Sequence, residues 1–153
     1  MQVDDELATY LRPGPYSVIV AACGANLAPE AVRGWGTRLL EDGSTIDVFV
    51  GREPAHRLVS ALSQRKAMAL SVANVTTYQA LQLKGTCLEI GVADEADRAR
   101  VRTHFEAFVA GVKRVGISEQ AARGTLVTDV IRLRFAPDQL FDQTPGPDAG
   151  TPR

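Results

Sequence analysis

The side chains best suited to acid–base, metal or thiol chemistry are few and widely spaced in this sequence. His56 and His104 each fall in a segment that predicts a helix, and neither has a cysteine or a second histidine at the spacing of a zinc site. We therefore expect both to be solvated helix residues rather than catalytic bases, and we expect no metal site. Cys23 and Cys87 fall in apolar, strand-like segments and are expected to be reduced, buried thiols. These side chains identify no catalytic residue.

Motifs for nucleotide binding and for nucleophilic catalysis are also absent. The sequence contains no Walker-type loop and no G-x-S-x-G motif. The "GWG" at 34–36 is too short to be a dinucleotide-binding fingerprint, and it falls in a predicted strand rather than at a strand-to-helix turn. Side-chain motifs alone therefore do not name a reaction.

Composition and charge narrow the class of protein. The 153 residues fit one domain, with 45% hydrophobic and 23% charged residues. The net charge is −1 with both signs interspersed, which argues against nucleic-acid and anionic-membrane partners. The longest purely apolar run, "VIVAAC" at 18–23, is too short to span a bilayer, and the acidic "DDE" near the start is unlike a secretory signal. We expect a cytoplasmic protein.

Alternation of apolar and polar residues predicts six strands. The Asp-Gly in "EDGS" at 41–44 is a strong hairpin signal and divides 32–51 into two strands. The other four strands are expected at 16–24, 67–73, 75–91 and 126–135, and a loop is expected at 25–31. Strands in this number, with only a few helices among them, favour a mainly β fold built as an antiparallel barrel.

Four helices are expected around these strands, at 3–11, 52–65, 94–116 and 118–124. Pro54 suits a first helical position, and Asp94 suits a helix N-cap. Two apolar faces recur at helical spacing, and their members are Ala55, Leu58, Val59 and Leu62, and Val101, Phe105, Phe108 and Val112. We assign 1–141 to the single barrel domain and 142–153 to a mobile tail rich in proline and glycine.

The strand expected at 75–91 changes phase at Gly85. Its apolar side chains occupy odd positions before the glycine and even positions after it, as Leu81, Leu83, Leu88 and Ile90. Side chains on a strand alternate faces, so an unbroken strand cannot place all four on one core. A bulge at Gly85 is therefore predicted, of the kind that bends the long strands of a barrel.

The order of these segments resembles a known family. The strand "VRGWGTR" is followed by a hairpin, the strand "TIDVFVG", a helix, a strand and then "TTYQALQLKG". This order is similar to the pyridoxamine 5'-phosphate oxidase-like family of FMN-binding split barrels, over roughly residues 14–150. The closing "LFDQTPGPDAG" also resembles the C-terminal segment of uncharacterised members of that group.

The resemblance implies a six-stranded antiparallel split β-barrel with flanking helices, forming a homodimer with FMN in a cleft between subunits. Arg33 and Arg38 match the family's basic pair on the first flavin-contacting strand, and guanidinium groups can bind phosphate in bidentate fashion. The residues expected to bind the cofactor are Arg33, Trp35, Gly36, Thr37, Arg38, Phe49, Val50, Gln82 and Lys84. The activity implied is an FMN-dependent oxidoreductase that exchanges electrons with a small-molecule donor or acceptor.

Two alternatives remain open from the residues themselves. The same barrel could hold heme, another tetrapyrrole or a deazaflavin, with His56 or His104 as the heme ligand. The chain could instead be a non-enzymatic dimeric binding module with a degenerate cleft, because "GREPAH" places Glu53 and Pro54 where the oxidases carry a serine and basic residues. Trp35 could likewise anchor a core or a dimer interface instead of a cofactor.

Overall fold

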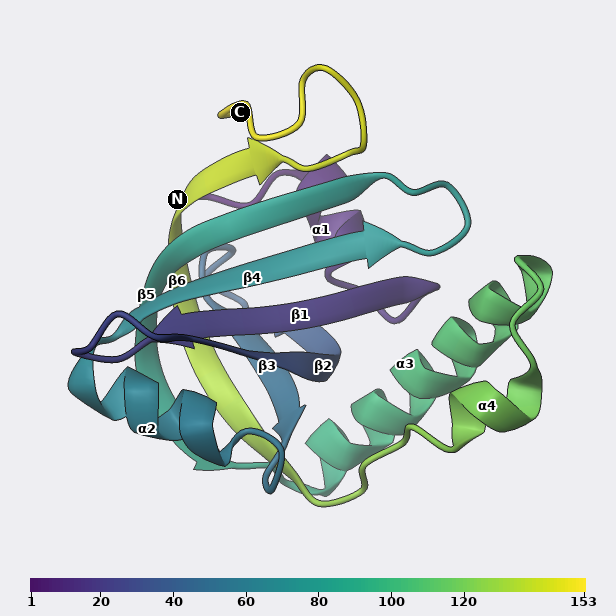
Figure 1. Ribbon diagram of the computed structural model, residues 1–153, viewed down its shortest axis with the longest axis horizontal. Helices are drawn as coiled ribbons and strands as arrows, with labels where there is room; N and C mark the ends of the chain where they lie inside the picture. Colours follow the sequence, from purple (N-terminus) through teal and green to yellow (C-terminus); the bar gives the residue numbers. More distant parts are fainter.

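Six antiparallel strands close into a barrel in the order β1–β2–β3–β6–β5–β4 (Figure 1). The computed structural model describes residues 1–153. Its strands are β1 (Tyr16–Cys23), β2 (Pro29–Leu39), β3 (Ile46–Gly51), β4 (Ala67–Asn74), β5 (Ala80–Val92) and β6 (Val130–Asp142). The predicted mainly β, six-stranded antiparallel barrel with flanking helices is confirmed.

The interior of the barrel holds one large apolar core. Alternate side chains of every strand point inward, so that Val18, Val48, Leu70, Leu83 and Leu133 are almost completely buried together. Two helices, α1 (Asp5–Tyr10) and α2 (His56–Gln64), add leucines to the same core. The predicted apolar face of α2 is confirmed. None of the helices is both long and apolar enough to cross a membrane.

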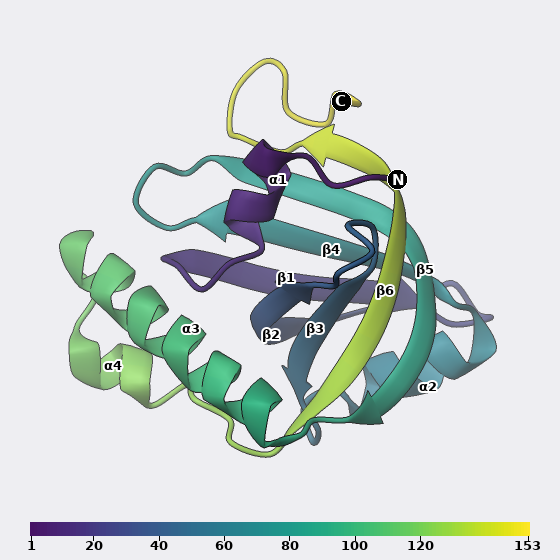
Figure 2. The ribbon, with the colours of Figure 1, turned by 180° about the vertical axis from the view of Figure 1, so that it is seen from behind.

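A second, smaller core forms outside the barrel, under α3 (Glu95–Arg114) and α4 (Glu119–Arg123) (Figure 2). The side chain of Asp94 accepts a hydrogen bond from Asp97 N, and the side chain of Asp97 accepts one from Asp94 N. This capping box fixes the start of α3 and confirms the predicted cap. The helix packs Phe105 and Phe108 edge-on against Trp35, with ring centroids 5.6 and 6.4 Å apart.

The register between β5 and β6 shifts at Gly85, as predicted, but the extra residue is Asp138 on β6. A Cβ at Gly85 would clash with the carbonyl oxygen of Ala136 and lie 2.7 Å from Pro137 Cα, so the close approach of β6 requires glycine.

The change of phase within β5 lies further along the strand than predicted. Cys87 still points inward, and a second bulge inserts Leu88, which is 49% exposed. Ile90 then pairs with Leu133 and shares its face, but it lies near the end of the barrel and stays 38% exposed. The expectation that Leu88 joins the core is wrong, because Leu88 is itself the bulged residue.

Several element boundaries differ from those expected. The expectation that Pro54 begins a helix is wrong, because α2 begins at His56 after a turn, and β6 begins at Val130 rather than at 126. β2 begins at Pro29, inside the expected loop, because it pairs with β1 as far as Cys23. β5 begins at Ala80, since Asn74 holds the residues after it in a tight turn through its side chain. β6 continues to Asp142, where the bulge at Asp138 lets it keep pairing with β5 beyond Pro137.

Residues 143–153 fold back along the barrel. Pro152 bridges to Phe141, Arg153 forms an ion pair with Glu6, and the backbone of Asp142 bonds Gly150 and Thr151. The domain limit at 141 and the mobility of this tail stay predictions.

Candidate functional site

One broad face of the barrel has no helix lying over it. The strands β5, β4 and β1 lie side by side at the front of Figure 1, with α2, α3 and the C-terminal segment around their margins. We call the outward-pointing side chains of these strands and of the adjoining part of β2 the outer face. It is open for a ligand or a second chain.

The register of the strands arranges the outer face in rows. One row runs across five strands through Arg33, Ile19, Ser71, Gln82 and Phe141. The neighbouring row runs through Ala31, Ala21, Ala69, Lys84 and Gln139. Three residues predicted to bind a cofactor, Arg33, Gln82 and Lys84, thus lie on one face in adjacent rows.

The middle of the outer face carries small side chains. Ser17, Ala21, Ala69, Ser71 and Ala73 point outward and are only half-buried. Strands usually carry β-branched or aromatic residues where their surface is packed by the same chain. The small residues leave a flat, shallow surface that a planar group can approach closely.

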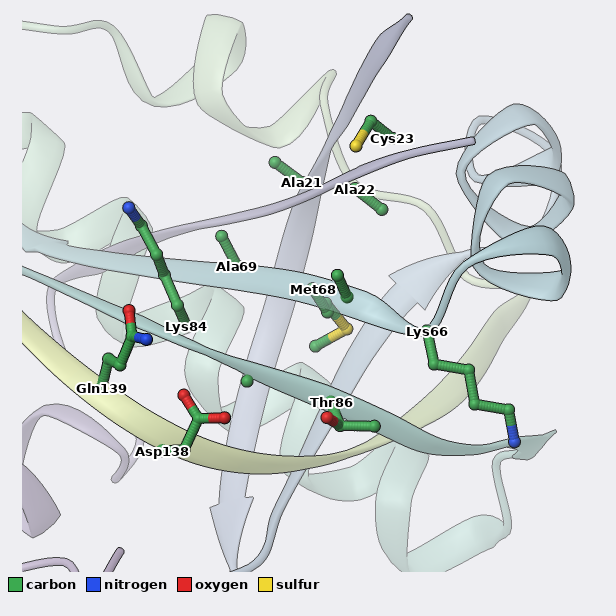
Figure 3. A pocket seen from close by; sticks show the side chains of 12 residues that line it. Ala21, Ala22, Cys23, Lys66, Met68, Ala69, Lys84, Thr86, Asp138 and Gln139 are labelled. Atoms are coloured by element: carbon green, nitrogen blue, oxygen red, sulfur yellow. The ribbon is translucent and has the colours of Figure 1, made fainter. Parts of the chain in front are cut away.

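A pocket of about 560 Å³ lies at the end of this face where β1 ends and β4 begins, beside the middle of β5 (Figure 3). Its twelve lining residues include Ala21, Cys23 and Ala69, and we call it the lysine pocket because Lys66 and Lys84 also line it. Figure 3 shows the two lysines toward opposite ends of the pocket. Neither lysine forms an ion pair, although Asp138 also lines the pocket. Lys84 Nζ lies 4.5 Å from the ring centroid of Phe141. The pocket therefore offers two cations to an anionic ligand.

Gln82 is held in one orientation on the outer face. Its amide nitrogen donates to Ser71 Oγ at 3.2 Å, and its amide oxygen accepts from Gln143 Nε2 at 3.4 Å. An amide fixed in this way offers its second N–H and its remaining lone pair to a ligand above the sheet.

A second pocket, of about 490 Å³, adjoins the other end of the outer face. We call it the Arg33 pocket, since Arg33 is its single charged lining residue. The Arg33 guanidinium carbon lies 5.5 Å from the Trp35 ring centroid and 5.2 Å from that of Phe108. It forms no ion pair, so its charge is free to meet a ligand.

Arg38 is placed quite differently from Arg33. Its guanidinium lies 2.6 Å from Asp47 Oδ2 and 2.8 Å from Asp97 Oδ1, both on fully buried carboxylates. Burial alone would raise the pKa of Asp47, but hydrogen bonds from Arg134 and Arg38 outweigh it and lower the pKa. Arg38 thus joins β2 and β3 to α3, and the predicted pair of arginines does not face one ligand.

The remaining predicted site residues lie inside the protein. Trp35 and Phe49 are buried beneath α3, and Val50 lies in the barrel core. Thr37 is buried and donates its hydroxyl hydrogen to Leu11 O at 2.9 Å. Gly36 has a φ of +130°, and a Cβ there would lie 3.3 Å from His104 Cβ. The four side chains thus pack within this chain. The part of these five residues in cofactor binding stays a prediction.

The expectation that His104 is solvated is wrong. His104 is 2% exposed between α3 and β2, and no hydrogen-bond partner reaches its Nδ1. Burial lowers its pKa to about 4, although the nearby Tyr16 backbone acts in the opposite direction. His56 is exposed, as predicted, and borders a different pocket near the β5 terminus at Val92. No histidine lies on the outer face.

The thiols and the other titratable groups form no further centre. Cys87 is buried and Cys23 is half-buried, and both are free, as predicted. No group of three or more histidine, cysteine, aspartate or glutamate side chains gathers at metal-binding distance. Arg52, which precedes the α2 segment, pairs with Asp129 at 3.0 Å rather than facing the open surface.

Lys66 and the small residues of the outer face were not predicted as site residues. A signal for them exists in "AMALSVA" at 67–73, where alternate positions carry Ala67, Ala69, Ser71 and Ala73. This alternation gives the strand one face of large apolar side chains and a second face with little side-chain bulk.

Solved structures share this arrangement of strands. No protein-family model and no curated protein sequence matches the chain. The protein HupZ of Group A Streptococcus superposes with a TM-score of 0.58 at 15% identity, over 97% of this chain and 100% of that one. A pyridoxamine 5'-phosphate oxidase-related, FMN binding protein from Nostoc punctiforme superposes with a TM-score of 0.54 at 16% identity, over 97% and 89% of the two chains.

The chain has the split-barrel fold of the pyridoxamine 5'-phosphate oxidase-like proteins. The predicted resemblance is thereby confirmed for the fold. An F420 reductase has the same fold, with a TM-score of 0.52 at 15% identity over 85% of this chain and 92% of the reductase. Split barrels with different cofactors in their names therefore share this fold. The choice of cofactor must be argued from the residues of the outer face.

Proposed function

We propose that this split barrel binds FMN on its outer face and acts as an oxidoreductase with a small-molecule electron donor or acceptor. The observation that carries the proposal is the row arrangement, which places Gln82 and Lys84 beside a flat surface of small residues with no helix over it. The names of two similarly folded proteins, one FMN binding and one an F420 reductase, support a flavin-type cofactor.

The residues of the outer face fit the two parts of FMN. Ala21, Ala69 and Ser71 offer a shallow surface for a planar ring system. Neither Lys84 nor Lys66 has a carboxylate partner, and Lys84, which lies in the second row of the outer face, would hold a phosphate in the lysine pocket. Asp138 is the one acidic residue there, so two positive charges face one negative charge.

The chain's own contribution would be binding and orientation. Bound FMN would supply reversible electron or hydride transfer, and no acid or base need come from a side chain. The fixed amide of Gln82 would hydrogen-bond the polar edge of the ring, with Ser71 and Gln143 maintaining its orientation. Arg33, in the same row, would place a positive charge at the far side of the face.

We further propose that a second copy of the chain covers the outer face. Ile19 lies between Arg33 and Ser71 in the row and is 37% exposed, on a strand that no helix covers (Figure 1). Burying such a surface in a homodimer would exclude water from the cofactor and couple its affinity to dimerisation. A cytoplasmic location stays a prediction.

The proposal is tested by titrating FMN into the purified protein and into Lys84→Ala. Loss of one phosphate contact is expected to weaken FMN binding by about tenfold or more. Arg12→Ala, which removes an exposed arginine without an ion pair elsewhere, serves as the control and should bind FMN like the wild type. Equal FMN affinity in Lys84→Ala and the wild type would show that the lysine pocket is not the phosphate site. Binding of F420 with no binding of FMN would overturn the choice of cofactor.

A further inference from the structure

We infer that the Arg33 pocket binds a small apolar carboxylic acid, at a site next to the proposed flavin surface and distinct from the lysine pocket. The site follows from the pocket itself and not from the cofactor. Use of this acid as the substrate would rest on the proposed function.

The walls of the pocket come from four parts of the fold. They are the N-terminal half of β1 with the neighbouring part of β2, the β4–β5 turn, the C-terminal end of α3 with the residues after it, and the segment after β6. Most of the lining is apolar, and it includes Val75, Tyr78, Phe108, Val112, Val115, Ile117 and Pro145. A volume of about 490 Å³ lies within the usual range of small-molecule sites.

The charge of the pocket is that of Arg33 alone. No aspartate or glutamate lines the pocket, and the other polar lining residues are Ser17, Asn74 and Gln143. The rings of Trp35 and Phe108 hold the guanidinium by cation–π contacts and limit its orientation. Its N–H edge therefore stays free for a planar, singly charged acceptor, which a carboxylate matches in bidentate fashion.

A carboxylate fits this pocket better than a phosphate does. One arginine compensates one negative charge, whereas a phosphate dianion would leave a second charge against apolar walls. The lysine pocket offers two cations for that purpose. The two ends of the outer face thus differ in charge and in polarity, which favours two ligands of different chemistry.

Tyr78 is held in an unusual conformation at the mouth of the pocket. Its φ is +62°, a value that bulky residues rarely adopt. The side chain of Asn74 accepts hydrogen bonds from Thr76 N and Thr77 N and fixes the turn that imposes this conformation. As a result Tyr78 lines the pocket while remaining 63% exposed, where it can cover an apolar ligand.

The C-terminal segment supplies the remaining wall. Thr144 accepts a hydrogen bond from Ala80 N at 3.1 Å, and Gln143 N bonds Ala80 O at 2.8 Å. These bonds place Gln143 and Pro145 against the pocket. The same Gln143 bonds Gln82, so the pocket and the outer face share one polar link.

The test compares 2-naphthylacetate with 2-naphthylacetamide, which has nearly the same shape but no charge. Calorimetric titration of the full chain, without added flavin, is expected to show the acid bound about tenfold or more tighter than the amide. Arg33→Met keeps an apolar stem against the aromatic rings and should remove this preference, whereas Arg33→Lys should keep part of it. Tyr78→Ala should weaken both ligands.

Arg12→Met is the matched control, because it removes an exposed, unpaired cation that lines neither pocket. It should leave both affinities unchanged. The inference is overturned if the acid and the amide bind equally, if neither binds, or if Arg12→Met abolishes the preference for the acid. It is also overturned if Arg33→Met loses FMN but keeps the acid, since Arg33 would then belong to the cofactor. Failure to bind FMN at all would reject the proposed function and leave the acid site standing.

Discussion

Arg38 Nη2 lies 2.6 Å from Oδ2 of the fully buried Asp47, across the β2–β3 pair. Arg33, five residues earlier in the same strand, faces no carboxylate and lies against the rings of Trp35 and Phe108. The two arginines that match one family motif thus have different surroundings in this chain. One joins elements of the fold, and the other is available to a ligand.

Arg38→Ala should destabilise the protein. The change leaves Asp97 without its arginine and Asp47 with Arg134 as its close remaining partner, and uncompensated buried carboxylates are costly. We expect the free energy of unfolding to fall by about 2–4 kcal/mol in urea denaturation. Unchanged stability together with loss of FMN binding would instead make Arg38 a phosphate ligand, as the sequence predicted.

Gly85→Ala should disrupt the pairing of β5 with β6. An added Cβ meets backbone atoms of Ala136 and Pro137, which cannot move aside as a flexible side chain could. Overpacking of this kind costs about 1–3 kcal/mol, so the thermal midpoint should fall. Gly116→Ala is a useful comparison, because a Cβ there meets no neighbour and the cost comes only from its φ of +87°. A larger loss at Gly116 than at Gly85 would show that the close approach of β6 is unimportant.

Stability should decrease between pH 7 and pH 5 because of His104. Its pKa in the folded protein is about 4, below its ordinary value of 6.5, so the unfolded chain binds the proton first as the pH falls. The stabilisation is therefore complete above the ordinary pKa and is lost progressively toward pH 4. We expect the free energy of unfolding to fall by about 2 kcal/mol between pH 7 and pH 5.

The variant His104→Leu separates this effect from that of the carboxylates. Leucine suits the buried position between α3 and β2 and does not titrate in this range. Denaturation at several pH values should show a nearly flat dependence from pH 7 to pH 5 in the variant. If the variant keeps the slope of the wild type, another group causes it.

The barrel was predictable because its signals are local. Six alternating segments and the Asp-Gly turn indicate the strands, and Asp94 with the apolar stripe of 94–116 indicates α3. The burial of His104 was predictable in principle, since it follows Val101 by three residues and precedes Phe108 by four, within the same stripe. The residue type favours a solvent position for a histidine, whereas its place in the stripe predicts burial.

The composition of the site was harder to predict because it depends on partners distant in sequence. The register of the hairpin could have placed Arg38 opposite Asp47, but nothing local indicates Asp97, which arrives with α3. Likewise, Phe108 reaches Arg33 only once α3 has packed. The bulges at Asp138 and Leu88 both depend on the pairing of β6 with β5. The alternation of β5 alone therefore predicts the phase change at Gly85, three residues before Leu88.

The most direct measurement is the visible absorption spectrum of the protein after incubation with FMN and removal of the excess, compared with that of Ala69→Phe. Ala69 lies in the middle of the outer face, so a phenyl ring there should block a planar ligand without entering the core. Ala96→Phe, on an exposed position of α3, controls for the added ring. We predict about one flavin retained per chain in the wild type and in Ala96→Phe, and little in Ala69→Phe. A colourless wild type, or flavin retained equally by Ala69→Phe, would contradict binding on the outer face.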